Sequence, residues 1–395
     1  MFEFATIEEE KLTFKILVIF GTRPEAIKLA PVIHRLAERA DHLRQILVVT
    51  AQHREMLDQV LRLFNIKPDY DLDLMRPGQS PFEITAQVLL GLKPILETER
   101  PDIVLVQGDT TTVLAASLAA YYFKIPIGHV EAGLRTYDKF QPFPEEMNRR
   151  LTGVLADLHF APTPTAREHL LHENVPAERI FVTGNTVIDS LLSVSNRPYT
   201  FNISPLDRLD FERRRVILVT AHRRENWGAP LRSICAAIQR LIGDFSDIEV
   251  VFSVHKNPAV RQIVQAELEG LARVHLIEPL DYEPFVHLMK RACLILTDSG
   301  GIQEEAPSLG KPVLVLRNVT ERPEGIAAGT LRLVGTDTEH IVEQTGRLLT
   351  DPNAYAAMAQ ASNPYGDGHA AERIVTILEG WLQGHIPNLS IGGSV

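Results

Sequence analysis

The chain has 395 residues, of which 45% are hydrophobic and 23% charged, and its formal net charge at pH 7 is -10. One hydrophobic core seldom organises a chain of this length, so we expect two domains of an ordinary globular protein. The acidic balance argues against a nucleic-acid partner, because broad binding to phosphate backbones needs a basic surface. Two cysteines provide neither a disulfide framework nor a cysteine-based metal site.

The sequence carries no pattern of a membrane or secretory protein. No apolar segment approaches the ~20 residues that span a bilayer, so we expect no membrane partner. Residues 1–14 include a run of three glutamates and lack the basic start and apolar middle of a secretory signal. We therefore expect a cytoplasmic protein and interpret residues 1–14 as an N-terminal extension.

The first half of the chain alternates strand and helix patterns. Short, uninterrupted apolar runs of the kind found in parallel sheets predict strands at 15–20, 46–50, 103–107, 125–130, 158–161 and 180–183. Helical patterns lie between them, for example at 28–40 and 82–99, and residues 69–80 are predicted to form a loop. The alternation predicts a parallel sheet with helices on both faces.

The second half repeats this pattern after a break at 195–214, which we interpret as a linker. Strands are predicted at 215–220, 248–254, 274–277, 292–296 and 312–316, and a last helix at 367–383. The predicted fold class is α/β, with two doubly wound, Rossmann-like domains facing a central cleft. These domains are residues 15–194 and 215–365, followed by a terminal helix and tail at 366–395. In such sheets ligands lie at the carboxyl ends of the strands.

The strand predicted at 292–296 is followed by a turn of small residues and then by a helix pattern that begins at Ile302. The turn contains Ser299, Gly300 and Gly301. Glycines let the backbone approach a ligand closely, and the free N–H groups of a helix start favour an anion, above all a phosphate. Glu305 could be a helix-starting carboxylate, but beside a phosphate turn we favour a bond to ribose hydroxyls.

Three carboxylates stand near strand ends of the first half. Asp109 and Glu131 follow consecutive predicted strands, and Glu145 opens a helix after a loop. Each has an ordinary alternative, because Asp109 could be a helix N-cap and Glu145 a first-turn helix charge. As a trio they predict an acid/base site, since neighbouring carboxylates push each other's pKa values apart.

Cationic residues also follow strand ends. Arg23 and Lys28 lie after the first strand, and His222 follows the first strand of the second half. A cation at His222 could hold a diphosphate leaving group through charge-assisted hydrogen bonds. Arg223 and Arg224 could serve the same purpose or could be surface ion-pair residues, and the sequence leaves both interpretations open.

Common cofactor motifs are missing or misplaced. No Walker motif occurs, and the one formal match to G-x-G-x-x-A, at 366–371, does not follow a strand, so an NAD cofactor is unsupported. No H-E-x-x-H or C-x-x-C motif occurs, and the 14 histidines do not cluster at ligand spacing. We expect no cofactor and no metal.

Seven segments together resemble the bacterial non-hydrolysing UDP-N-acetylglucosamine 2-epimerases. They are GTRPEAIK at 21–28, GDTTT at 108–112, HVEAGLR at 129–135, PEE at 144–146, HRRE at 222–225, TDSGGIQEE at 297–305 and NPYGDG at 363–368. The likeness runs in order from about residue 15 to residue 373. It implies the two-domain fold of GT-B glycosyltransferases, with the C-terminal helix crossing back to the first domain.

The resemblance also implies roles for individual residues. It implies reversible conversion of UDP-GlcNAc to UDP-ManNAc without a redox cofactor, and homodimers. The acid/base carboxylates of the family match Asp109, Glu131 and Glu145. The family's residues around the substrate and its diphosphate match Arg23, Lys28 and His222. The remaining matches are Ser299, Gly300 and Gly301 for the phosphates, Glu305 for the ribose, Phe285 for uracil, Arg322 for the nucleotide, and Gln52 and Arg76 for an activating second UDP-GlcNAc site.

Three other functions would use the same UDP site. A GT-B glycosyltransferase would need an acceptor, a hydrolysing epimerase would release free ManNAc and UDP, and a UDP-sugar sensor would bind without turnover. The epimerase interpretation needs no acceptor and explains the acidic trio, because loss of UDP from C1 acidifies the C2 hydrogen for a carboxylate base.

Overall fold

The computed structural model describes residues 13–51, 54–74, 76 and 78–385 of the chain. It divides into two compact units, of which unit 1 comprises Met1–Thr186 and His369–Val395 and unit 2 comprises Val187–Gly368. The chain passes from unit 1 to unit 2 in α7 (Thr186–Ser195) and returns after Gly368. The sequence placed the ends of the two domains at residues 194 and 365.

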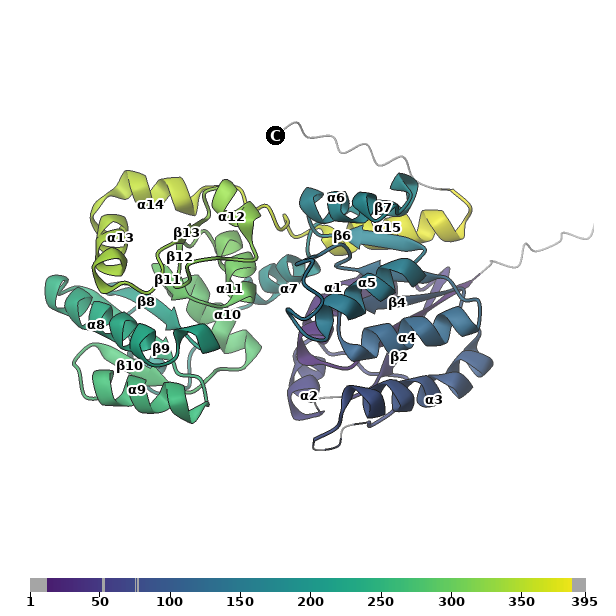
Figure 1. The fold of residues 1–395 in the computed structure, drawn as a ribbon, viewed down its shortest axis with the longest axis horizontal. Coiled ribbons are helices and arrows are strands. Elements are labelled where there is room, and N and C mark those ends of the chain that lie inside the picture. Colours follow the sequence, from purple (N-terminus) through teal and green to yellow (C-terminus); the bar gives the residue numbers. More distant parts are fainter. Residues whose placement is uncertain (1–12, 52–53, 75, 77, 386–395) are drawn as a thin grey trace, which may run out of the picture. The chain divides into compact units, whose positions relative to one another are not determined.

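Unit 1 is built on a seven-stranded parallel sheet (Figure 1). In spatial order the strands are β3 (Tyr70–Asp71), β2 (Leu43–Val49), β1 (Phe14–Phe20), β4 (Ile103–Gln107), β5 (Ile127–Val130), β6 (Leu158–Ala161) and β7 (Ile180–Val182). The central strands are buried on both faces, which is why they read as unbroken apolar runs. Phe20 and Phe160 are among the largest side chains that are fully buried here.

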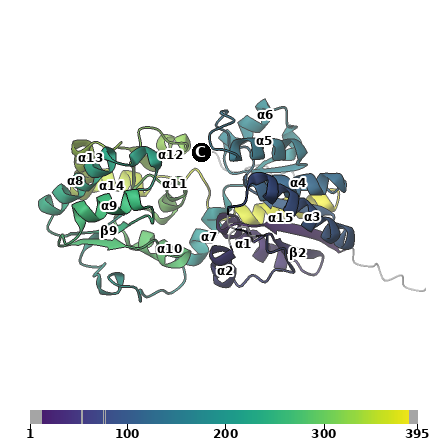
Figure 2. The same cartoon turned by 60° about the horizontal axis from the view of Figure 1, so that its bottom comes forward.

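Helices cover both faces of this sheet. One group that packs together is α3 (Pro81–Glu99), α4 (Thr111–Tyr122) and α5 (Glu145–Leu155). The other is α1 (Arg23–Ala37), α2 (Arg54–Leu63) and the C-terminal α15 (Ala370–Leu382), which lies beside α1 (Figure 2). The helix α6 (Pro164–His172) connects β6 to β7. Right-handed crossovers that leave β1 and β4 in opposite directions place α1 and α4 on opposite faces.

Unit 2 is also built on a parallel sheet, which has six strands. Its spatial order is β10 (Val274–Ile277), β9 (Ile248–Ser253), β8 (Arg215–Thr220), β11 (Leu294–Thr297), β12 (Val313–Val315) and β13 (Leu331–Leu333). Its helices are α8 (Ala229–Asp244), α9 (Pro258–Leu268), α10 (Tyr282–Arg291), α11 (Gly300–Glu305), α12 (Pro323–Ala327), α13 (Thr338–Thr350) and α14 (Pro352–Ala359). The predicted fold class of two parallel-sheet α/β domains is confirmed.

Each sheet has one point where the strand order reverses. In unit 1 the connections leave β1 toward β2 and β3, and leave β4 toward β5, β6 and β7. In unit 2 the corresponding neighbours are β8 and β11. Ligands of open α/β sheets bind outside the carboxyl ends of the strands at this switch point. The turns at Gly21 and Gly108 lie there in unit 1, and those at His222 and Asp298 lie there in unit 2.

Some local predictions were wrong. Two edge strands, β3 and β13, were missed, and β3 lies inside the predicted loop at 69–80. The strand predicted at 292–296 begins later, at Leu294, because α10 continues to Arg291. The helix expected to begin at Ile302 begins at Gly300, so Glu305 ends α11 and no acidic residue occupies the first turn.

The segment expected to be a linker, 195–214, belongs to unit 2 and contains no strand. Its first residue, Ser195, is the last residue of α7, and a short 3-10 turn spans Leu206–Arg208. The Tyr199 ring stacks on His287 of α10 at 4.5 Å, and Arg291 lies over the Phe201 and Phe211 rings. Arg291 also donates a hydrogen bond to the Tyr199 carbonyl, at 2.5 Å. The segment is therefore packed against α10.

Candidate active site

In unit 1, the acidic side chains predicted from the sequence converge at the switch point. Asp109 follows β4, where Gly108 makes a turn with φ of +79° that favours glycine. Glu131 follows β5, and Glu145 is the first residue of α5. Lys28, in the second turn of α1, reaches across to Glu131. The side chain of Thr110, not that of Asp109, caps α4, so Asp109 has no N-cap function.

Glu131 is held by three donors. Lys28 Nζ donates to both of its carboxylate oxygens, at 2.5 and 2.7 Å. The amide of Gln107 donates to Oε2, and that of Asn185 donates to Oε1 at 3.2 Å. The backbone of Glu131 has a φ of +64°, a left-handed conformation that costs a non-glycine residue about 1 kcal/mol or more. These contacts hold the side chain in one position despite that cost.

Two residues of α5 contact Asp109, and the pKa of Asp109 is raised. Arg149 Nη2 lies 3.3 Å from its Oδ2, and Asn148 Nδ2 donates to its carbonyl at 2.9 Å. Burial raises the pKa of Asp109 to about 6; the Arg149 charge works against this, and the Glu131 and Glu145 charges add to it. A carboxylate with a pKa close to the working pH is suited to exchange protons with a substrate.

Neighbouring glutamates of α5 have different environments. Glu146 is fully buried and accepts hydrogen bonds from the backbone N–H groups of Thr136 and Tyr137, so it fixes the loop before α5. Glu145 Oε2 is buried and has no hydrogen-bond partner among the described residues. An unpaired buried carboxylate oxygen is costly, which makes Glu145 the better candidate for contact with a ligand.

A further buried carboxylate, Glu25, ties two turns of unit 1 together. It accepts hydrogen bonds from the Gly21 and Thr22 backbone N–H groups and, at 2.6 Å, from the Thr110 hydroxyl. Burial raises its pKa, and these hydrogen bonds oppose the effect. Its neighbour Arg23 is the first residue of α1 and makes no ion pair with any described residue.

In unit 2, Asp298 organises the switch point. Its side chain is 0% exposed, and its Oδ2 accepts hydrogen bonds from the His222 and Arg223 backbone N–H groups and from Asn226 Nδ2, at 2.8, 2.8 and 2.9 Å. Its Oδ1 lies 3.1 Å from His222 Nδ1. Burial alone would raise the pKa of Asp298, but the hydrogen bonds from His222 and Arg223 hold it below its usual value. The ring of His255 stacks on that of His222, with centroids 5.6 Å apart.

The predicted phosphate turn carries two arginines beside it. A Cβ built on Gly300 would lie 3.7 Å from a terminal nitrogen of both Arg223 and Arg322. The Nε atom of Arg223 is buried and has no partner within the described part of the chain. Gln303 donates to the Ser299 carbonyl at 3.1 Å and so fixes the turn. Two guanidinium groups and the free N–H groups of a helix start form a suitable site for phosphate oxygens.

The predicted nucleoside residues lie next to this turn. The hydroxyl of Tyr282 donates to Glu305 Oε2 at 3.4 Å, and Phe285 stands one turn later on the same face of α10, half-buried. Glu304 forms a short ion pair with Arg322, so the two adjacent glutamates have separate partners. Glu304 is buried, whereas Glu305 is only partly covered.

Of the two residues predicted for a second nucleotide site, the structure describes only Arg76. Gln52 lies outside the described residues. Arg76 is exposed, and its Nη1 donates to the Asp73 carbonyl at 3.1 Å. Their predicted role stays a prediction.

The sequence as a whole matches one protein family. The family model described as UDP-N-acetylglucosamine 2-epimerase matches residues 35–379. The chain belongs to the UDP-N-acetylglucosamine 2-epimerase family. The UDP-N-acetylglucosamine 2-epimerase of Escherichia coli K12 is 56% identical over 375 residues, which cover 92% of this chain and 98% of that protein.

Solved structures agree with this family membership. The crystal structure of UDP-GlcNAc 2-epimerase from Neisseria meningitidis bound to UDP-GlcNAc is similar, with a TM-score of 0.82, 51% identity and coverage of 93% of this chain and 100% of that chain. A glycotransferase of kitacinnamycin is only 13% identical, yet has a TM-score of 0.63 over 94% of this chain and 99% of that one. The latter likeness concerns the fold alone and agrees with the GT-B fold that the resemblance implied.

Several residues of this epimerase-family site were missed by the sequence reasoning. Gln107, Asn185 and Arg149 contact the unit 1 carboxylates, and Asp298 anchors His222. Two of them carried a signal, because Gln107 is the polar last residue of an apolar strand and Asp298 directly follows one. Asn185 and Arg149 carried none, since their contacts arise only when distant segments fold together.

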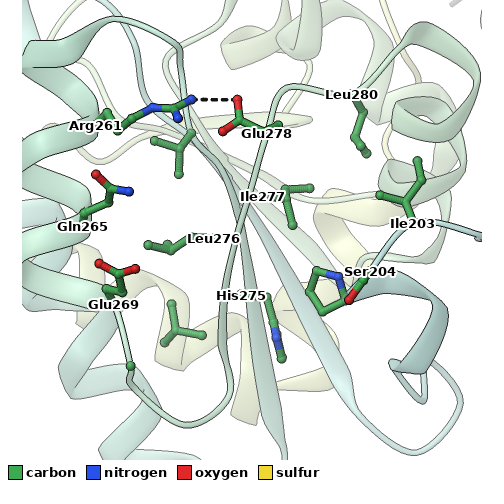
Figure 3. Close-up of a pocket in the computed structure, with 14 residues that line it drawn as sticks. Ile203, Ser204, Arg261, Gln265, Glu269, His275, Leu276, Ile277, Glu278 and Leu280 are labelled. Carbon is green, nitrogen blue, oxygen red and sulfur yellow. Dashed lines mark hydrogen bonds and ion pairs between the residues drawn. The ribbon is translucent and has the colours of Figure 1, made fainter.

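A separate cavity of about 580 Å³ lies beside the edge strand β10 of unit 2 (Figure 3). Apolar side chains such as Leu276 and Ile277 line it, and Arg261 donates to Glu278 at 2.7 Å across its upper rim. None of the predicted site residues lines it. Being at the sheet edge and not at the switch point, it is not the candidate active site.

The described residues contain no cluster of three or more metal-ligating side chains. None of their helices is long and apolar enough to cross a membrane.

Proposed function

We propose that this protein reversibly converts UDP-GlcNAc to UDP-ManNAc by eliminating UDP from C1 and adding it back there, while a proton returns to the opposite face of C2. The proposal rests on the match of residues 35–379 to the family model and on two sites, one in each unit. One is an anion site with Arg223 and Arg322 beside Gly300. The other is the acidic trio at the switch point of unit 1.

The anion site holds the UDP portion. Free N–H groups at the start of α11, the guanidinium groups of Arg223 and Arg322, and the His222 side chain stabilise the diphosphate as it leaves C1. Phe285 contacts the uracil and Glu305 the ribose. Asp298 keeps the His222 imidazole turned so that Nδ1 faces Asp298, which leaves Nε2 for the phosphate oxygens.

The acidic trio acts on the hexose. The C2 hydrogen is not next to a carbonyl, so it becomes acidic only when the C1–O bond breaks and the ring gains oxocarbenium character. A carboxylate base then removes the proton and leaves 2-acetamidoglucal with UDP. Return of a proton to the other face of C2, with UDP adding back at C1, gives the epimer.

The environments of the three carboxylates suggest their roles. Asp109, whose pKa is raised to about 6, is ionised at neutral pH and still basic enough to accept the C2 proton. Glu145 presents its unpaired Oε2 to the other face of the ring. Glu131 is neutralised by Lys28 and therefore positions the sugar and balances charge. Arg23 completes the site from the start of α1.

We also propose a homodimer that forms through the layer of α3, α4 and α5. Large apolar side chains are exposed on neighbouring helices there, including Tyr121 and Tyr122 at the end of α4 and Val154, which is 83% exposed, at the end of α5. Both helices start at the carboxyl edge of the sheet, so these ends lie near each other. A patch of this kind is typical of a protein interface.

We also propose that the protein is cytoplasmic. The unpaired thiols Cys235 and Cys293 suit the reducing cytoplasm.

One incubation distinguishes the proposal from its alternatives. The protein is mixed with UDP-GlcNAc alone in deuterated water, and the products are followed by NMR. The proposal predicts UDP-ManNAc with deuterium at C2. Free ManNAc and UDP would indicate a hydrolysing enzyme, and absence of turnover until an acceptor is added would indicate a transferase. Binding without turnover under any of these conditions would indicate a sensor.

A further inference from the structure

Arg149 forms an ion pair with Asp109, and its side chain is fixed in place. Its side chain is only 10% exposed. Its Nη2 lies 3.3 Å from Asp109 Oδ2, while its Nε lies 3.4 Å from Glu146 Oε2 and donates at 3.4 Å to the Glu145 carbonyl. The guanidinium group is therefore held at its inner side and presents its far end to Asp109.

The Glu146 anchor is itself rigid. Glu146 is 0% exposed and accepts hydrogen bonds from two consecutive backbone N–H groups of the loop before α5, at 3.0 and 3.1 Å. Asn148, one residue before Arg149, holds the Asp109 backbone carbonyl at 2.9 Å. The first turns of α5 thus fix both the main chain and the carboxylate of Asp109.

Two acidic neighbours of Asp109 oppose its ionisation, and two basic neighbours favour it. Glu131, after β5, and Glu145, on α5, are the acidic neighbours, and Lys28, on α1, is the second basic one. Lys28 is already paired with Glu131. Arg149 is the strongest of the influences that favour the ionised form of Asp109. The buried His129 nearby has a pKa lowered to about 4 by burial, so it stays neutral near pH 6 and above.

We propose that Arg149 is a positioning residue that acts through Asp109 and sets the lower pH limit of epimerisation. This inference rests on the proposed function, in which ionised Asp109 accepts the C2 proton. Arg149 does not touch the substrate; it keeps the base ionised and oriented. Since an opposite charge at this distance lowers a carboxyl pKa by about one unit or more, loss of Arg149 moves the acid limb of the pH profile to higher pH.

The test compares Arg149→Gln, the charge-conserving Arg149→Lys and a matched control, Arg150→Gln. Arg150 is the next residue of α5 and pairs with Glu173 at the surface, at 3.5 Å. Turnover of UDP-GlcNAc is measured across the pH range. We expect R149Q to lose activity about five-fold near pH 6 and less than about two-fold near pH 8, as a one-unit shift requires. R149K should restore most of the activity at low pH, and R150Q should match the wild type.

A merely structural role would give a different result. If R149Q lowers activity by the same factor at every pH, or leaves the profile unchanged, the proposal is overturned. Titration of the Asp109 carboxyl carbon by ¹³C NMR in the wild type and in R149K and R149Q gives a second readout that needs no turnover. A wild type without epimerase activity would refute the proposed function, whereas an unshifted Asp109 titration in R149Q would refute the role of Arg149.

Discussion

Lys28 Nζ donates to both carboxylate oxygens of Glu131, at 2.5 and 2.7 Å. The two residues are 103 positions apart, and their side chains are only 19% and 7% exposed. The pair joins α1 to the turn after β5 and neutralises a buried carboxylate at the point where a negatively charged substrate is expected.

Lys28→Met should leave that carboxylate buried without its cation. We expect the free energy of unfolding of unit 1 to fall by about 2–3 kcal/mol, while Lys28→Met combined with Glu131→Gln should lose less than the sum of the two single variants. Urea unfolding followed by Trp381 in a Trp227→Phe background reports on unit 1, because Trp381 lies in α15. The control Lys93→Met breaks an exposed pair and should cost about 0.5 kcal/mol or less. Strict additivity would show that the pair is not coupled.

Asp109→Asn should stabilise unit 1 at neutral pH. The pKa of Asp109 is raised from 3.8 to about 6, so the folded state binds its proton more tightly than the unfolded state, and rising pH through that window removes stability. The side chain is 30% exposed, and solvent screening reduces the expected cost above about pH 6 to about 1 kcal/mol. Urea unfolding of D109N should show this gain near neutral pH and almost none below about pH 4. An equal gain at both pH values would contradict the assignment.

Asp298→Asn should impair catalysis more than nucleotide binding. The amide oxygen can replace Oδ2 and still accept the three hydrogen bonds of the His222 turn, but the amide NH₂ group then faces His222 Nδ1. His222 Nδ1 thereby loses its carboxylate partner and faces a donor instead, so we expect turnover to fall about 100-fold and UDP affinity to change less than about ten-fold. Calorimetry and turnover assays measure the two effects. Asp281→Asn, at an exposed residue before α10 whose side chain makes no cap hydrogen bond, serves as control. Equal losses in binding and turnover would argue against a specific role in orienting His222.

Gly300→Ala should weaken UDP binding without destabilising unit 2. The added methyl group would lie in ordinary contact with two guanidinium groups, 3.7 Å from each, and would occupy space that we assign to phosphate oxygens. We expect the UDP dissociation constant to rise about ten-fold or more, with unfolding unchanged when followed by Trp227 in a Trp381→Phe background. Gly243→Ala, at a position with open space in α8, is the matched control. Undiminished UDP affinity in G300A would place the phosphates elsewhere.

Val154→Glu should convert the proposed homodimer to a monomer, because a charge would be buried in an apolar interface. Analytical ultracentrifugation at several concentrations measures the mass. Val319→Glu, an equally drastic change at a side chain that is 73% exposed in unit 2, should leave the mass unchanged. If wild type and V154E have the same mass, the dimer does not use this face.

The sequence predicted the strands that position the site because buried parallel strands are continuous apolar runs, and the polar residue that ends each run is conspicuous. It therefore located Asp109, Glu131 and His222 at strand ends. It missed β3 and β13, because edge strands of two or three residues leave no run to detect.

Contacts between distant segments could not be predicted in this way. Arg149 and Asp109 are separated in the sequence by α4, β5 and a loop, and nothing in the local pattern of α5 distinguishes Arg149 from Arg150. The different hydrogen bonding of Glu145 and Glu146 also depends on tertiary structure, since adjacent helix residues point in different directions.

Cleavage of the bond between C1 and the diphosphate is the step on which all of these roles depend. It can be measured with UDP-GlcNAc that carries ¹⁸O in the oxygen between C1 and the β-phosphorus. We expect that, during epimerisation, the label becomes distributed among the β-phosphate oxygens, because the β-phosphate of free UDP rotates in the site before UDP adds back. Complete retention of the label in the bridge while UDP-ManNAc forms would contradict it.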